Sequence, residues 1–351
     1  MANYSYWDQI LHRQFLSESS NLSNYFFQKL NKNSAHYNDA SKVKHIFITG
    51  LARAGTTAVL NRIFACGDFG SILYKHMPFI LSPKIASIMS KFANSGNEQQ
   101  KARLHGDGIM FNSNSPECLD EVFWIKSAGD WFKSDTLSAY EPTISQLKAY
   151  SYLLYKYSQF QNKDRMIIKN NNHHLRIISL ANYFKDSKIL VLFRDPLSHA
   201  KSLFDQHLNF LKIHNKDSFS LEYMNLIGHR EFGRNFAPFV YNTQNGKFHL
   251  NYNENKLNFW LAQWIATYTW ILKVAHLKLK NIILISYEDL CNHKYLYQKI
   301  ASTLDIKNFN LGIPFSSSNK KYTNLNQNEV DEDLRNISND LYRRLNYLSF
   351  K

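Results

Sequence analysis

The chain has 351 residues, 44% of them hydrophobic, which is enough to bury the core of one large α/β domain or two small ones. Its net charge of +14 favours anionic partners such as nucleotides, acidic glycans or an anionic membrane surface. No run of five or more Lys or Arg residues occurs, which argues against a nucleic-acid-binding tail. The three cysteines, Cys66, Cys118 and Cys291, lie far apart and form neither a disulfide framework nor a zinc-binding spacing.

Sparse cysteines, and the lack of a signal-peptide pattern in residues 1–15, predict a reducing, cytoplasmic location. Residues 257–272 are weakly polar, but they are too short and too rich in Gln and Thr for a membrane span, so we expect a buried helix. Residues 1–42 predict a helical lead-in with a break at about residues 17–24. Residues 43–351 then form a single domain without internal repeats.

A strand, a glycine-bounded turn and a helix follow one another in residues 46–63. Gly50 and Gly55 have the G-x-x-x-x-G spacing of a P-loop, whose backbone N–H groups and helix N-terminus bind phosphate. Thr56 and Thr57 stand where a nucleoside triphosphatase has Lys and Ser or Thr, and the cation comes earlier, at Arg53. This arrangement predicts a phosphate cradle that does not carry out ordinary ATP or GTP chemistry.

Residues 71–83 and 115–124 hold candidate acids and bases. A strand ending at Tyr74 or Lys75 would place His76 at the carboxyl end of a strand, where open α/β sheets bind ligands. A helix starting with Ser115 as N-cap would carry three acids, Glu117, Asp120 and Glu121, in its first turns. These acids either stabilise the helix dipole or take part in the chemistry.

Two more strand–loop–helix units follow the first. Strand 165–169 leads through Asn170 to a helix at 175–184, and strand 188–193 leads through Arg194 to a helix at 197–211. Such units predict parallel strands with helical crossovers, and therefore an α/β, P-loop-type, three-layer fold with a central parallel sheet flanked by helices. The remaining expectations are helices at 144–161, 257–278, 293–304 and 328–348, a strand at 281–285, and an irregular insertion at about 205–260 whose segments 228–233 and 241–258 lie on the surface.

A second anion site is predicted where the strand 188–193 ends. If Pro196 opens the next helix, Ser202 lies about two turns along it and faces inward. Ser198 is closer in sequence and competes for this position. An arginine and a hydroxyl at a second strand end suit a second phosphate group.

In these motifs the chain resembles the sulfotransferases that use 3′-phosphoadenosine 5′-phosphosulfate (PAPS). Residues 50–57 resemble their 5′-phosphosulfate loop, and Arg194-Asp195-Pro196 with Ser202 resembles their 3′-phosphate motif. Residues 75–78 are similar to the catalytic-histidine segment of the cytosolic branch. Lys169-Asn170 and residues 287–290 are similar to the bacterial and glycan-modifying branch. The chain departs from the pattern in three ways: Ala54 replaces a serine, one residue is missing before His76, and no R-K-G-x-x-G-x-W segment is present.

The resemblance implies PAPS as co-substrate and no metal. Residues 53–57, namely Arg53, Ala54, Gly55, Thr56 and Thr57, would hold the 5′-phosphosulfate, and Arg194 with Ser202 would hold the 3′-phosphate. Arg53 would also stabilise the leaving group, and Lys169 would contact the sulfonate or, alternatively, only close its strand at the surface. His76 is the first candidate for the base, since an imidazole suits proton abstraction near neutral pH. Glu117, Glu121 and Asp107 compete with it.

The acceptor implied by the bacterial-type motifs is a carbohydrate or glycolipid hydroxyl, with the insertion at 205–260 on the acceptor side. A phenol, a small alcohol and a peptide tyrosine stay open as alternatives, as does the oligomeric state. Two other classes of function compete with the transferase. One is a P-loop kinase or NTPase, which the threonine at position 56 disfavours, and the other is a non-catalytic anion- or nucleic-acid-binding protein.

Overall fold

Four parallel strands form the central sheet of the computed structural model, in the order β5-β1-β6-β8. The structure describes residues 4–37, 43–93, 101–102, 110–117, 119–307, 315 and 330–351. The strands are β1 (Ile46–Thr49), β5 (Ile167–Lys169), β6 (Lys188–Phe193) and β8 (Ile282–Ser286). Ile46 is in register with Ile167 on one side and Lys188 on the other. The predicted parallel sheet is confirmed.

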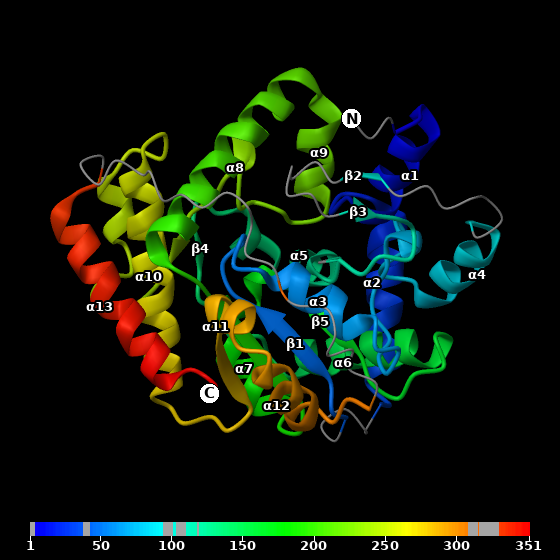
Figure 1. Ribbon diagram of the computed structural model, residues 1–351. Coiled ribbons are helices and arrows are strands. Elements are labelled where there is room, and N and C mark those ends of the chain that lie inside the picture. The colour runs from blue at the N-terminus through cyan, green and yellow to red at the C-terminus, as the bar shows by residue number, and fades with distance from the viewer. Residues whose placement is uncertain are drawn as a thin grey trace.

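Side chains alternate between two hydrophobic layers along β1, as the period of a strand requires. Phe47 points into the larger core, whereas Ile46 and Ile48 point into a second core on the opposite face. The second core is covered by α3 (Thr56–Phe64), α11 (Tyr287–Asn292) and α12 (Tyr295–Thr303). Figure 1 shows these helices around the sheet, and the three layers confirm the predicted fold class.

The larger core is packed by the other helices. They are α1 (Tyr6–Leu16), α2 (Asn21–Ser34), α4 (Pro83–Ala93), α5 (Glu121–Ala128), α6 (Ile144–Phe160), α7 (Ile177–Tyr183), α8 (Pro196–Lys216), α9 (Ser218–Leu226), α10 (Leu257–Ala275) and α13 (Glu332–Leu348). Short strands pair outside the main sheet: β2 (Lys101–Ala102) with β3 (Met110–Phe111), and β4 (Leu137–Ser138) with β7 (Phe239–Val240). The two N-terminal helices lie against the body, α1 beside α9 and α2 beside α6 (Figure 1).

Several predicted elements are confirmed with small shifts of their ends. The break in the lead-in falls between α1 and α2, and the helices expected at 144–161, 257–278, 293–304 and 328–348 are α6, α10, α12 and α13. α10 is buried along most of its length, as predicted for residues 257–272. Within the described ranges, no helix combines the length and the apolar character needed to cross a bilayer.

Two predicted elements are wrong. Residues Tyr74–His76 form a 3₁₀ turn rather than the end of a strand. The helix expected from Ser115 begins only at Glu121, because Pro116 pairs with Leu73 in an isolated bridge and the Ser115 hydroxyl accepts a hydrogen bond from the Asn112 N–H. The local capping pattern is therefore overridden by a contact with a distant segment.

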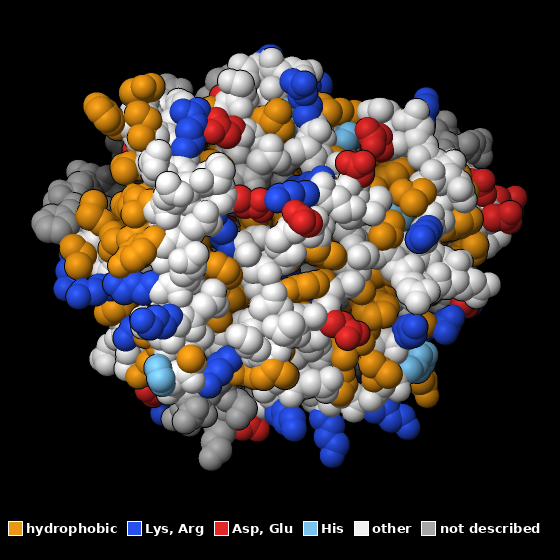
Figure 2. Space-filling view, turned by 180° about the vertical axis from the view of Figure 1, so that it is seen from behind, with side chains coloured by type: hydrophobic (Ala, Val, Ile, Leu, Met, Phe, Trp, Pro, Cys, Tyr) orange, Lys and Arg blue, Asp and Glu red, His pale blue; other side chains and the backbone are white. Residues whose placement is uncertain are grey.

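The strand order places a switch point between β1 and β6. From β1 the chain goes to β5 on one side and later to β6 on the other, so the loops at the carboxyl ends of β1 and β6 diverge there and leave room for a ligand. On the face seen in Figure 2, Lys and Arg side chains are dispersed rather than gathered into one stripe. The high positive charge therefore does not form a single basic stripe on this face.

Candidate active site

The loop that follows β1, residues 50–57, is termed the glycine loop. Gly55 is the N-cap of α3 and has φ 91°, and an added Cβ would lie 2.3 Å from the Tyr287 ring. At Gly50, an added Cβ would lie 2.4 Å from the Leu192 carbonyl oxygen of β6. Only glycine allows both the left-handed backbone and this close approach. The loop is thereby pressed against β6 and α11, and the N-terminus of α3 faces the switch point.

The backbone N–H groups of the glycine loop are used in two ways. The Ala54 N–H donates to the Leu51 carbonyl at 3.2 Å, so this group closes the turn, although Ala54 was expected among the residues that hold the donor. The N–H groups of Thr56 and Thr57 lie in the first turn of α3 and have no acceptor within the helix. These two groups, with the helix dipole, suit an anion. The Ala54 side chain is fully buried in the second core.

Arg53, Arg194 and Ser202 come together, although they come from three segments of the chain. Arg53 has φ 71°, and its Nε donates to Ser202 Oγ at 3.2 Å. Nη1 of Arg194 donates to the Arg53 carbonyl at 3.2 Å. Ser198 instead donates its backbone N–H to Asp195, the N-cap of α8. The structure thus unites the residues expected at two anion sites, with Ser202 rather than Ser198 in contact with the glycine loop.

The Glu288 carboxylate lies beside Arg194 and the start of α8. Glu288 Oε1 accepts the Asp195 N–H at 3.0 Å and lies 3.9 Å from Arg194 Nε, and Oε2 accepts the Tyr342 hydroxyl at 3.2 Å. Burial raises the pKa of Glu288, although the Asp195 N–H and the charge of Arg194 oppose this shift. Glu288 therefore ties the arginine to the start of α8 and to the C-terminal helix.

Lys169 and Glu117 form a buried ion pair, with 2.7 Å between Nζ and Oε1. Their side chains are 5% and 3% exposed. The purely structural role predicted for each residue is wrong. Lys169 is buried rather than closing its strand at the surface, and Glu117 precedes α5, the helix whose dipole it was expected to stabilise.

Asp120 and Glu121 belong to a buried polar network rather than to the cavity. Asn170 Nδ2 donates to Asp120 at 3.1 Å and to Glu121 at 2.6 Å. Glu121 also pairs with Arg176, and Asp120 accepts the Tyr150 hydroxyl at 2.7 Å. Glu121 is tied to Asn170 and Arg176 through its Oε2 atom, and these contacts fix the loop after β5. Asp107, the fourth candidate base, lies outside the described residues.

His76 lies in a buried 3₁₀ turn and not, as predicted, at the carboxyl end of a strand. It is 3% exposed, its Nδ1 accepts the Leu73 N–H at 3.0 Å, and its ring lies 4.9 Å from the Tyr157 ring. Burial, with a smaller effect of Lys75, lowers its pKa to about 3. His76 is not among the residues that line the cavity described next, so this geometry favours a structural role over a base.

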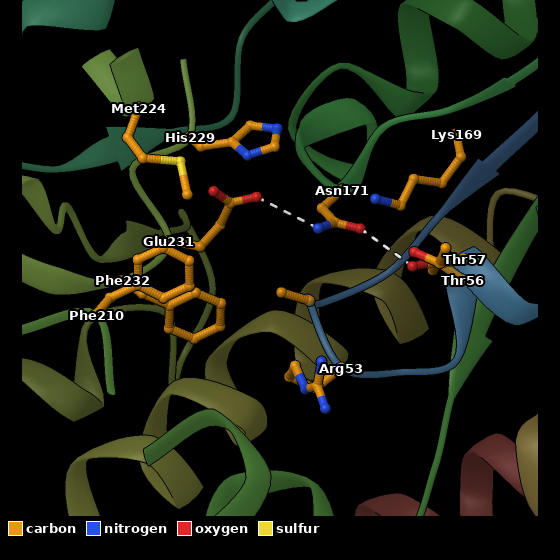
Figure 3. A pocket seen from close by; sticks show the side chains of 11 residues that line it. Arg53, Thr56, Thr57, Lys169, Asn171, Phe210, Met224, His229, Glu231 and Phe232 are labelled. Carbon is orange, nitrogen blue, oxygen red and sulfur yellow. Dashed lines mark hydrogen bonds between the residues drawn. The ribbon is translucent and has the colours of Figure 1, made fainter. Parts of the chain in front are cut away.

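A small cavity lies at the switch point, and several segments of the chain contribute to its walls. Figure 3 shows its side chains. Arg53, Thr56 and Thr57 come from the glycine loop, and Lys169 and Asn171 from the segment after β5. The wall across from them comes from α8, α9 and the segment 228–233, here called the opposing loop. The side chains of this wall are Phe210 from α8, Met224 from α9, and His229, Glu231 and Phe232 from the opposing loop.

The opposing loop was expected on the surface, and this expectation is wrong. Glu231 and Phe232 are only 8% and 7% exposed. Two glycines with φ above 70°, Gly228 and Gly233, bracket the loop, and side chains fill the space beside both. This pair of glycines is the sequence signal that could have indicated a tightly packed, buried loop at residues 228–233.

The fold and the site define a class: a glycine loop and a helix N-terminus at the switch point of a parallel sheet make an α/β protein of the P-loop type, with an arginine in the loop. Among such proteins, the sequence profile of the sulfotransferase family matches residues 45–238, more than half of the chain. The protein belongs to the sulfotransferase family.

Solved structures of bacterial sulfotransferases are distantly similar. Sulfotransferase STF1 from Mycobacterium tuberculosis H37Rv is 13% identical, with a TM-score of 0.44 over 98% of this chain and 87% of that one. STF9 from Mycobacterium avium is 12% identical, with a TM-score of 0.43 over 88% and 75%. A sulfotransferase from Alicyclobacillus acidocaldarius is 12% identical, with a TM-score of 0.37 over 87% and 95%. No curated protein matches the chain.

Proposed function

We propose that the protein transfers a sulfonate group from PAPS to a hydroxyl group of an acceptor. The observation that carries the proposal is the direct contact between two anion-binding elements, the glycine loop with Arg53 and the pair Arg194 and Ser202. PAPS carries a 5′-phosphosulfate and a 3′-phosphate on one ribose. A donor of this kind needs two cationic sites side by side, whereas a nucleoside triphosphate does not.

Each residue then has a role that its position supports. The hydroxyls of Thr56 and Thr57 and the N–H groups of the first turn of α3 hold the 5′-phosphosulfate, with Gly55 and Ala54 shaping the turn. Arg53 stabilises the charge that develops on the leaving oxygen, and Lys169, held by Glu117, contacts the sulfonate. Arg194 and Ser202 bind the 3′-phosphate. Most of the catalysis is positioning and charge stabilisation, by analogy with phosphoryl transfer, and the scheme gives no role to a metal.

The acceptor that the cavity wall supports is a glycolipid, or a similar hydroxyl compound with an apolar part. Phe210, Met224 and Phe232 offer an apolar surface, and the rings of Phe210 and Phe232 lie parallel with their centres 6.1 Å apart. His229 and Glu231 offer hydrogen bonds to sugar hydroxyls on the same wall. A cytoplasmic enzyme with a charge of +14 would meet such an acceptor at an anionic membrane surface.

Calorimetric titration tests the donor. 3′-Phosphoadenosine 5′-phosphate should bind tightly, with 5′-AMP at least tenfold weaker, and Arg194→Ala should lower the bisphosphate affinity by about tenfold to a hundredfold, as expected for a lost charge-assisted contact. Equal affinity for the two nucleotides would contradict the proposal. Magnesium-dependent binding of ATP instead would indicate a kinase or NTPase, and salt-sensitive binding of oligonucleotides without nucleotide preference would indicate a binding protein.

A further inference from the structure

The cavity contains one carboxylate, Glu231, whose only role so far is to bind hydroxyl groups of the acceptor. Glu231 is the only acidic residue among the described residues that line it. Neighbouring acids are paired, Glu117 with Lys169 and Glu121 with Arg176, but Glu231 makes no ion pair within the described part of the chain. A buried carboxylate without a cation costs free energy. A carboxylate in a site for a polyanionic donor also repels that donor, so its presence there calls for a function.

Asn171 links Glu231 to the glycine loop. Its Nδ2 donates to Glu231 Oε1 at 3.3 Å, and its Oδ1 accepts the Thr56 hydroxyl at 3.3 Å. The backbone of Asn171 is fixed in turn, because its carbonyl accepts the Thr49 hydroxyl at 2.9 Å. Figure 3 shows the Glu231 carboxylate pointing into the cavity toward Asn171, across from Thr56 and Thr57. The side-chain amide of Asn171 therefore bridges the Glu231 carboxylate and the glycine loop.

The opposing loop holds Glu231 rigidly. Two histidines of α8 accept backbone N–H groups at its end: His207 Nδ1 from Gly233 at 3.3 Å, and His214 Nδ1 from Arg234 at 3.2 Å. Arg230 donates to the carbonyl groups of Phe132 and Ser134. A catalytic group needs this kind of support, since a misplacement of about 1 Å can cost a hundredfold in rate.

We propose that Glu231 is the general base of the transfer and that Asn171 is its positioning residue, an inference that rests on the proposed function. Glu231 Oε2, which has no hydrogen-bond partner among the described residues, takes the proton of the acceptor hydroxyl. The acceptor oxygen forms its bond to sulfur while the bond from sulfur to the bridging oxygen breaks. The electron pair of that bond goes to the 5′-phosphate, beside Arg53 and Thr56.

The variant Glu231→Gln tests the base, because it keeps the shape and removes the proton acceptor. Radiolabelled PAPS serves as donor and n-octyl β-D-glucoside as a glycolipid mimic. Where wild type transfers no label to the glucoside, release of sulfate to water reports the same proton transfer. We expect kcat to fall by about a hundredfold to ten-thousandfold. 3′-Phosphoadenosine 5′-phosphate should bind as tightly as to wild type or more tightly, because a repelling charge is gone.

Further variants separate catalysis from structure. Glu231→Asp should restore part of the rate, and the loss of kcat on the acid side of the pH profile should disappear in Glu231→Gln. Asn171→Ala should lower kcat by about tenfold to a hundredfold and keep that acid limb, because the base is still present. Glu254→Gln removes the same charge at an exposed position and should leave kcat unchanged.

Three outcomes overturn the proposal: turnover of Glu231→Gln within tenfold of wild type, weaker bisphosphate binding in proportion to lost turnover, or loss of the acid limb in His229→Gln instead. If wild type neither binds the bisphosphate nor consumes PAPS, the proposed function itself fails. If wild type does both and Glu231→Gln matches it, only the base assignment fails.

Discussion

The two walls of the cavity are built in different ways. The glycine loop is one contiguous segment between a strand and a helix, and its contacts with Arg194 and Ser202 join neighbouring strand ends. The opposing loop does not directly connect a sheet strand to a helix. It is held by hydrogen bonds to α8 and to the segment around Phe132. The first wall is a local strand–loop–helix unit of a kind that binds anions in many proteins. The second depends on tertiary contacts between distant segments, and under the proposed function it would face the acceptor.

The largest effect should come from the buried ion pair of Lys169, which lines the cavity on the side of the glycine loop. Glu117→Gln leaves the buried Lys169 ammonium without its carboxylate partner, and breaking a buried pair costs about 3–5 kcal/mol. Urea unfolding should show a loss of this size in the free energy of unfolding. The double variant Glu117→Leu, Lys169→Met should recover most of it. A single-variant loss below about 1 kcal/mol would show that the stability of this wall does not depend on the pair.

The same contrast explains what the sequence could predict. The strand, the glycines and the threonines of residues 46–57 follow from local periodicity and spacing, and so does Arg194 at the end of β6. Glu231 has no such local pattern, because its position depends on Asn171 and on two histidines of α8. Ser115 and Pro116 carry a good helix-start signal, yet the helix begins at Glu121, since the preceding segment pairs with Leu73. Contacts between distant segments decide these positions.

A substitution in the glycine loop should have the next largest effect. Gly55→Ala forces φ 91° on a residue with a Cβ, at a cost of about 1–2 kcal/mol, and pushes the Cβ into the Tyr287 ring, at a further cost of about 1–3 kcal/mol. Thermal unfolding and calorimetric titration should show lower stability and weaker binding of 3′-phosphoadenosine 5′-phosphate.

Gly67→Ala is the matched control for Gly55→Ala. Gly67 also has a positive φ, 78°, but no atom lies within 4 Å of the added Cβ. The Gly67→Ala variant should lose only about 1–2 kcal/mol of its free energy of unfolding, from the strained backbone, and should keep its nucleotide affinity. Equal losses in the two variants would mean that the contact with Tyr287 is not what shapes the glycine loop.

Acid should affect the two walls unequally, because buried histidines hold them through opposite hydrogen bonds. At the glycine loop, His199 Nε2 donates to the Ala52 carbonyl at 2.8 Å, a bond that the protonated ring keeps, and burial lowers the pKa of His199 to about 3, so this ring is protonated only at lower pH than His207. At the opposing loop, His207 Nδ1 accepts the Gly233 N–H, a bond that protonation breaks. Burial lowers the pKa of His207 from 6.5 to about 4. Its stabilising contribution is therefore complete above pH 6.5 and is lost as the pH falls toward 4.

His207→Gln should accordingly reduce the pH dependence of stability. A histidine that is protonated only when unfolded contributes up to about 1.4 kcal/mol per pH unit to the slope, and this variant removes that contribution between pH 6.5 and about 4. Urea unfolding across that range measures the slope. Gln206→Asn, the adjacent buried position, removes no titrating group and should shift the curve equally at every pH. If the free energy of unfolding of His207→Gln depends on pH as in wild type, protonation of His207 does not loosen the opposing loop. The same conclusion follows if, as the pH falls, nucleotide binding weakens at a higher pH than acceptor binding does.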